Sequence, residues 1–223
     1  MDITPPTASE TLDADYRYGA VLLIVLTLVV FEIVASAGKL ERAIAVGLAG
    51  GALIVAVATW RAPGRRRGQL TLLVIVTVAA MVAGIAAGVL SAAFAHAAVT
   101  LLLLAIPVTL ARGLQRLVRE RGATLHAIAG GLSIYLMLGL LFASVIAFVV
   151  DVDSEPYFAQ GHDVTNGDRV YFSFTTLTTT GYGDYSPATS VGHALAVLEM
   201  LSGQLFLVTV IGVLIGHYVR GRE

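Results

Sequence analysis

Long stretches without charged side chains alternate with short charged segments along this chain, and they constrain its fold more than any other feature. A helix that crosses a bilayer needs about 20 consecutive apolar residues. Each stretch is close to that length, so each is expected to form one transmembrane helix. The expected spans are residues 19–37, 43–60, 69–90, 94–111, 126–150 and 190–218. The sequence therefore predicts an all-α, polytopic membrane protein.

The composition excludes other classes of protein. Apolar residues make up 57% of the chain and charged residues 13%, whereas soluble domains have about 45–50% and about 25%. A soluble enzyme is excluded, and no cluster of nucleophile, base and orienting group suggests catalysis. The net charge of -1 offers no basic excess for binding nucleic acid. The chain has no cysteine, and its histidines lack metal-ligand spacing, so we expect no cofactor.

Arginines are concentrated in two connections between the expected spans. They are Arg61, Arg65, Arg66 and Arg67 after the second span, and Arg112, Arg116, Arg119 and Arg121 after the fourth. Basic connections favour the cytoplasmic side of a membrane. Because successive spans cross the membrane in opposite directions, both termini are then expected in the cytoplasm and the acidic segment 151–190 outside. We expect a multi-pass protein of the plasma membrane.

A distinctive motif lies between the last two spans, at residues 166–184. It reads Asn-Gly-Asp-Arg-Val-Tyr-Phe-Ser-Phe-Thr-Thr-Leu-Thr-Thr-Thr-Gly-Tyr-Gly-Asp. A turn in an outer loop would explain the Gly-Tyr-Gly-Asp sequence, but not the threonines or the preceding amphipathic stretch. Over residues 126–218 the chain resembles the pore of potassium channels, which consists of an outer helix, a short pore helix, a selectivity filter and an inner helix.

The resemblance implies one filter per chain, and hence a homotetramer around one central pore that conducts K+ passively. The filter is expected at Thr179, Thr180, Gly181, Tyr182 and Gly183. Carbonyl oxygens of the first four residues would bind K+ in place of its hydration water, and the Thr179 hydroxyl would complete the innermost site. The two glycines reach positive φ at little steric cost, which lets successive carbonyls face one side.

Other residues of the motif are expected to support the filter. By resemblance, Asp184 forms a hydrogen bond behind the filter and does not coordinate the ion. Thr175 stands where the family often has a carboxylate, and Thr178 lies at the C-terminal end of the pore helix, whose dipole favours a cation. Asp168 or Asn166 is expected to cap the N-terminus of the pore helix.

Three further residues of the expected spans are candidates for a role in function. Gly203 lies where many potassium channels place a gating hinge, although close helix packing explains it equally well. Glu199 lies one turn earlier and could border the ion pathway, but a buried hydrogen bond to the pore helix is the favoured interpretation. Glu32 is expected to extend toward Lys39 or Arg42.

The expected organisation follows from these assignments. It comprises a cytoplasmic tail at residues 1–18, a four-helix transmembrane region at 19–111, a cytoplasmic amphipathic linker at 112–124, a pore domain at 125–218 and a cytoplasmic C-terminus at 219–223. We expected the tail to be irregular, because Pro5 and Pro6 disfavour an early helix. Arginines of the linker would meet lipid phosphate at the inner surface.

The expected function is a potassium-selective channel that is not strongly voltage-gated, because the fourth span lacks the basic residues of a voltage sensor. The expected partners are K+, membrane lipid and further copies of the chain. Two alternatives remain open from the sequence. One is a weakly selective monovalent cation channel, since Thr180 replaces the commoner valine or isoleucine. The other is a non-conducting sensor or accessory subunit that keeps the pore fold.

Overall fold

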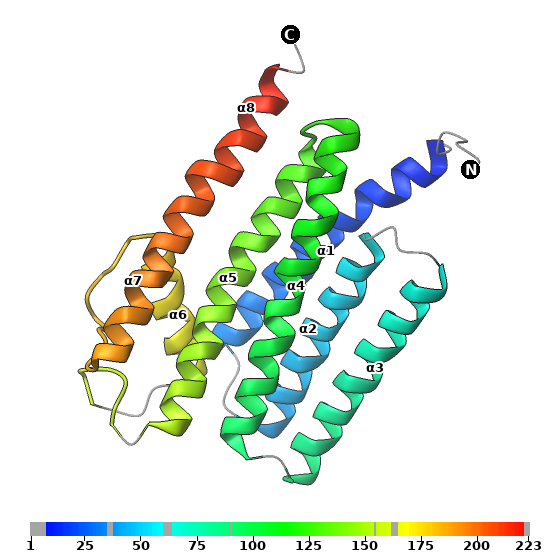
Figure 1. The fold of residues 1–223 in the computed structure, drawn as a ribbon. Coiled ribbons are helices and arrows are strands. Elements are labelled where there is room, and N and C mark those ends of the chain that lie inside the picture. The colour runs from blue at the N-terminus through cyan, green and yellow to red at the C-terminus, as the bar shows by residue number, and fades with distance from the viewer. Residues whose placement is uncertain are drawn as a thin grey trace.

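The computed structural model describes residues 8–34, 38–59, 64–89, 91–153, 155–161 and 165–220. Helices dominate this part of the chain and most of them run side by side in one bundle (Figure 1). They are α1 (Ala8–Val34), α2 (Lys39–Thr59), α3 (Gly64–Ala87), α4 (Ala92–Arg121), α5 (Leu125–Val152), α6 (Asn166–Leu177), α7 (Ser190–Leu205), the π-helix η1 (Phe206–Ile211) and α8 (Gly212–Arg220).

Five of the described helices are long and apolar enough to cross a membrane. They are α1, α3, α4, α5 and the continuous helix formed by α7, η1 and α8. The apolar part of α2, Ala43–Val57, is shorter. The protein is therefore an all-α, multi-pass membrane protein, as its apolar stretches predict.

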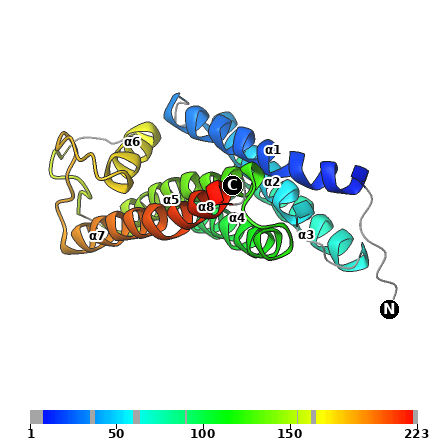
Figure 2. The same ribbon diagram turned by 90° about the horizontal axis from the view of Figure 1, so that it is seen from above.

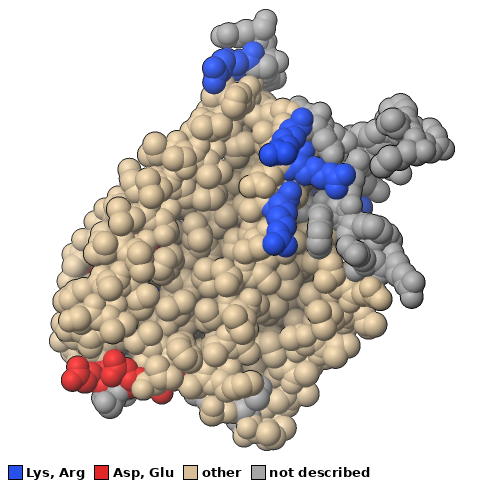
Figure 3. Space-filling model, viewed as in Figure 1, with Lys and Arg blue, Asp and Glu red and all other residues tan. Residues whose placement is uncertain are grey.

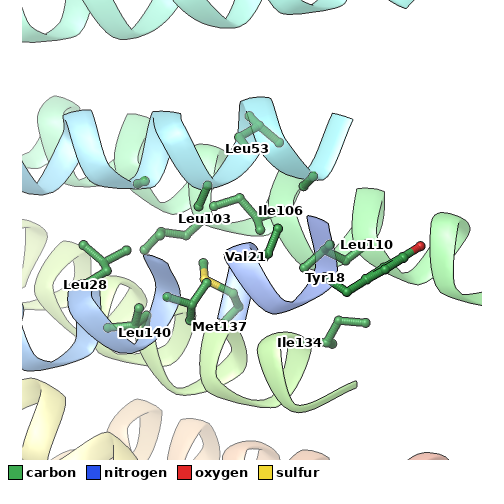
Figure 4. Packing of buried hydrophobic residues seen from close by; sticks show 14 of the residues in the cluster. Tyr18, Val21, Leu28, Leu53, Leu103, Ile106, Leu110, Ile134, Met137 and Leu140 are labelled. Carbon is green, nitrogen blue, oxygen red and sulfur yellow. The ribbon is translucent and has the colours of Figure 1, made fainter. Parts of the chain in front are cut away.

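The core of the bundle is formed by α1, α2, α4 and α5. Their apolar side chains point toward one another (Figure 4), and Val21, Leu28, Ile106 and Met137 are almost completely buried. The long contact between α4 and α5 joins the N-terminal helices to the first helix of the expected pore domain. In contrast, α3 lies at the edge of the bundle (Figure 1), where most of its apolar side chains are exposed.

Two expectations about the segments between the spans are corrected. Residues 8–18, expected to form part of an irregular tail, belong to α1. They contain no proline or glycine, so nothing in them interrupts the helix. The expected linker at 112–124 is not a separate element, because α4 continues to Arg121 and Gly122, with φ 72°, ends it. Leu114 and Leu117 are buried, so packing prolongs the helix beyond the expected span.

The short helix α6 lies among α1, α5 and α7 and carries the motif (Figure 2). Its N-cap is Thr165, whose hydroxyl accepts a hydrogen bond from the backbone N–H of Asp168, while the Asp168 carboxylate accepts one from the backbone N–H of Thr165. This capping box corrects the expectation that Asp168 or Asn166 is the cap, because Asp168 occupies the third helical position. The first helical residue, Asn166, is thereby left to interact elsewhere.

Charged side chains gather at opposite ends of the bundle (Figure 3). Exposed arginines of α4, namely Arg112, Arg116 and Arg119, lie near one end. The exposed carboxylates Asp151, Asp153 and Glu155 lie at and after the end of α5, at the opposite end. The surface between these ends carries many exposed apolar side chains, as expected for helices that cross a membrane.

Candidate ion-binding filter

The backbone alternates in handedness through the five residues after Thr178. Thr179, Gly181 and Gly183 have φ of 59°, 51° and 79°, whereas Thr180 and Tyr182 are not among the residues with positive φ. Alternating left-handed and right-handed residues turn successive peptide groups toward one side of the chain. The positive φ of both glycines was predicted, but that of Thr179 was not. A β-branched residue in this region is strained, and such strain is concentrated at functional sites.

The end of α6 holds the first half of this segment in place. The carbonyl oxygen of Thr175 accepts hydrogen bonds from the backbone N–H of Thr180 at 2.8 Å and of Gly181 at 3.1 Å. The Thr178 hydroxyl lies 2.9 Å from that of Thr180. Thr175 therefore supports the filter segment through its main chain, while its side chain donates to the carbonyl of Phe172 at 3.0 Å.

Two tyrosine–aspartate hydrogen bonds hold the second half. Tyr171 of α6 donates from its hydroxyl to Asp184 at 2.8 Å, and its ring stacks on Tyr182 with centroids 6.3 Å apart. Tyr185 forms a hydrogen bond with Asp168, and this bond raises the pKa of Tyr185. Asp184 thus binds a side chain of α6, behind the segment that the resemblance assigns to the filter.

For the potassium filter that the resemblance implies, we expect Tyr171→Phe to make K+ current unstable. The substitution removes the hydrogen bond to Asp184 but keeps the ring that stacks on Tyr182, so the outer part of the filter loses an anchor without losing its packing. Current under sustained recording should decay several-fold faster than in the unmodified channel. The matched control is Tyr157→Phe, because the Tyr157 hydroxyl donates to Gly192 on α7 and not to the filter segment. Equal decay in Tyr171→Phe and the unmodified protein would contradict a role for this bond.

Within one chain the filter segment is open on the side away from α6. Residues 178–184 are all exposed, and Tyr182 is 71% exposed although its ring stacks on Tyr171. Most of this segment is therefore not covered by the other described residues of the chain.

The buried carboxylate Glu199 joins the inner helix to the pore helix. It is only 1% exposed, and one of its oxygens accepts a hydrogen bond from the hydroxyl of Ser173 in α6. The Ser173 hydroxyl also lies 2.7 Å from the carbonyl oxygen of Gly139 in α5. The sequence left two roles for Glu199: a place beside the ion pathway or a buried hydrogen bond to the pore helix. The geometry corresponds to the buried hydrogen bond. In the described part of the chain, the second Glu199 oxygen has no hydrogen-bond partner.

Gly203 lies against the last residue of the pore helix. A Cβ atom placed on it would lie 2.3 Å from the carbonyl oxygen of Leu177. The same oxygen accepts a hydrogen bond from the buried hydroxyl of Tyr135 at 3.3 Å. Close packing is therefore sufficient to require glycine here. The backbone irregularity comes slightly later, where η1 interrupts the α-helical pattern from Phe206 to Ile211, and π-helical turns are frequent at functional sites.

Sequence reasoning missed several residues that hold the site together. Thr165 could have been identified from the Thr-x-x-Asp pattern of a capping box. Tyr171 and Ser173 have no such local signal, because their partners, Asp184 and Glu199, are distant in the chain. Contacts of that kind follow only from the packing of α6 against the filter segment and α7.

Comparison with known protein families agrees with this geometry. The model of a family described as an ion channel matches residues 133–219. No curated protein and no solved structure matches the chain. No group of three or more potential metal ligands was found among the described residues, and the only species that an ion channel must bind is the permeant ion. Residues 133–219, which include α6 and the segment after it, are therefore similar to the ion channel family, in agreement with the resemblance to potassium channels.

Proposed function

We propose that the protein is a potassium-selective channel that gives passive K+ flux across the plasma membrane as a homotetramer. The observation that carries this proposal is the alternating backbone at Thr179, Gly181 and Gly183. K+ would be bound by carbonyl oxygens of Thr179, Thr180, Gly181 and Tyr182. Rings of such oxygens can replace the hydration shell of the ion.

The proposed tetramer is supported by the surfaces that one chain leaves uncovered. The filter segment is exposed on one side, and the adjoining inner helix has a row of exposed apolar side chains: Val197, Leu198, Leu201, Leu205 and Val208. Further copies of the chain would cover part of this surface and close the ring of carbonyls. Cyclic assembly is also the simplest arrangement for identical subunits that each supply one part of a site.

The proposed orientation follows from the separation of charge along the bundle. The arginine-rich end of α4 would face the cytoplasm, where basic residues are favoured, and would contact anionic lipid phosphate. Both termini would then be cytoplasmic, and α6 with the filter would lie toward the outside. We assign no enzymatic activity and no nucleic-acid partner to the protein.

Voltage should have little influence on opening. A voltage sensor needs basic residues inside a spanning helix, where each charge is worth about 2.3 kcal/mol per 100 mV. In α4 the arginines Arg112, Arg116 and Arg119 all follow the expected span at residues 94–111 and lie in the last turns of the candidate span Ala93–Arg119. They would lie at the inner surface, where the field across the membrane does little work on them.

Reconstitution of the purified chain tests the proposal directly. In lipid vesicles with a K+ gradient we expect uptake of rubidium well above that of empty vesicles. Reversal potentials in opposed K+ and Na+ solutions should favour K+, and open probability should change little with voltage. Similar permeability to both ions would support a weakly selective cation channel. Uptake equal to that of empty vesicles would support an accessory subunit. Steep voltage dependence would contradict the expectation that voltage has little influence on opening.

A further inference from the structure

The outer end of α1 contacts the first residue of the pore helix. The carboxylate of Glu32 accepts a hydrogen bond from the side-chain amide of Asn166, and the same nitrogen lies 3.5 Å from the backbone carbonyl oxygen of Glu32. Lys39 and Arg42, the partners expected for Glu32, have side chains outside those that the structure describes. Glu32 therefore binds the first residue of the pore helix, although Glu32 and Asn166 are 134 positions apart in the sequence.

The backbones of α1 and α6 also lie very close at this point. A Cβ atom placed on Gly167 would lie 2.5 Å from the backbone carbonyl oxygen of Ile33. One turn further along α6, Val170 is buried in the same apolar cluster as Val25 and Leu28 of α1. The contact thus combines backbone proximity, apolar packing and a hydrogen bond. It fixes both the distance between the two helices and their rotation.

A buried cation completes the junction. Arg169 is 8% exposed and donates from its guanidinium to the side-chain oxygen of Asn166 at 3.4 Å. It is also close enough to interact electrostatically with Glu32. Asn166 therefore connects a carboxylate on α1 with a guanidinium on α6.

A cavity of about 80 Å³ lies beside this junction. Its lining includes Glu32, Asn166 and Arg169 together with His96 of α4 and Ser144 of α5. Polar groups on several sides make the cavity suitable for bound water. If the contact between Glu32 and Asn166 is weakened, the first turn of α6 can move into this cavity.

We infer that Glu32 is a positioning residue for ion selection: through Asn166, helix α1 fixes the outer end of the pore helix and thereby the geometry of the filter. The inference rests on the proposed channel function. The mechanical connection is short, because α6 has 12 residues and its other end is bonded to the filter backbone at Thr180 and Gly181. A displacement at Asn166 is thus transmitted along one helix to the ion-binding carbonyls.

Three variants separate this role from general effects on folding. Glu32→Ala removes the acceptor for Asn166, whereas Glu32→Gln keeps an oxygen that can accept the same hydrogen bond. Glu41→Ala is the matched control, because it removes another carboxylate that lines the cavity, from a helix that does not contact α6 in the described part of the chain. Size-exclusion profiles in detergent verify that each variant assembles as the unmodified protein does.

The decisive measurement is the permeability ratio of Na+ to K+, obtained from reversal potentials in reconstituted bilayers. We expect Glu32→Ala to raise this ratio about tenfold, since loss of a buried hydrogen-bond partner has effects of this order. Glu32→Gln should remain within about twofold of the unmodified channel, as should Glu41→Ala. A selective unmodified channel whose ratio is unchanged by Glu32→Ala would overturn the inference. Failure of the unmodified chain to conduct would instead refute the proposed function.

Hydrogen exchange tests the positioning step without any conduction. The hydrogen-bonded backbone amides near the start of α6, residues 168–170, should exchange about tenfold faster in Glu32→Ala than in the unmodified protein or Glu32→Gln, because local opening becomes easier. Exchange in α7 should not change. Equal exchange at residues 168–170 in all variants would overturn the inference, whatever the flux assays show.

Discussion

Gly181→Ala should abolish K+ flux while the protein still assembles. Gly181 has φ of 51°, and for a residue with a Cβ the left-handed conformation costs about 1–2 kcal/mol. In the proposed tetramer the cost arises once per subunit and totals roughly 4–8 kcal/mol at one filter. A cost of that size makes the ion-binding conformation rare, because each 1.4 kcal/mol corresponds to about tenfold in population. Rubidium uptake into vesicles should fall to the level of empty vesicles.

Gly161 provides a matched control for the substitution of Gly181. Gly161 lies in the outer loop with φ of 66°, and a Cβ atom placed on it meets nothing within 4 Å, as is also true of Gly181. Gly161→Ala therefore imposes a similar backbone strain at a site outside the filter. We expect it to lower stability slightly and to leave flux close to that of the unmodified protein. Selective flux through Gly181→Ala, or equal losses in both variants, would refute the assignment of the filter.

Gly203→Ala should impair both conduction and stability. The added Cβ would lie 2.3 Å from the carbonyl oxygen of Leu177 and 2.9 Å from its Cδ1 atom. Because a backbone oxygen cannot move aside as a side chain can, α7 must shift away from the end of α6. Overpacking of this kind costs about 1–3 kcal/mol. Flux should fall about tenfold, and the thermal unfolding midpoint of the protein in detergent should decrease by several degrees.

The control is Gly212→Ala, further along the same continuous helix. Its Cβ would lie 3.7 Å from the carbonyl oxygen of Leu207, which is an ordinary contact, so the variant should retain flux and unfold at the same or a higher temperature. If Gly203 acted only as a hinge, Gly203→Ala would change open probability but would not lower the unfolding midpoint. That result would contradict packing as the reason for glycine at this position.

Local patterns were sufficient to predict several parts of the fold. The apolar stretches predicted an all-α membrane protein because hydrocarbon requires helices that satisfy their own backbone hydrogen bonds. Positive φ at Gly181 and Gly183 followed from the residue type. The same local reasoning was wrong for residues 8–18, which are helical, and it placed a boundary after residue 111, where α4 continues to Arg121. For residues 112–121, burial of one face extends the helix beyond the point at which charged residues suggest an end.

The support of the filter could not be predicted in the same way. Tyr171 and Asp184 are joined by a side-chain hydrogen bond across 13 positions, Ser173 and Glu199 across 26, and Glu32 and Asn166 across 134. No periodicity or spacing in the sequence specifies such pairs. They form because α6 is packed among α1, α5 and α7, which brings polar groups that are distant in the sequence within hydrogen-bonding distance.

The sequence by itself predicted an all-α membrane protein and the positive φ of both glycines in the segment 179–183, because hydrophobic length and the conformational freedom of glycine are properties of local residues. Only the tertiary structure decided how that segment is held: by two tyrosine–aspartate bonds, by the contact of Gly203 with Leu177, and by α1 at the outer end of the pore helix. The reason is that the packing of the helices, and not the local sequence, decides which groups lie within reach of one another.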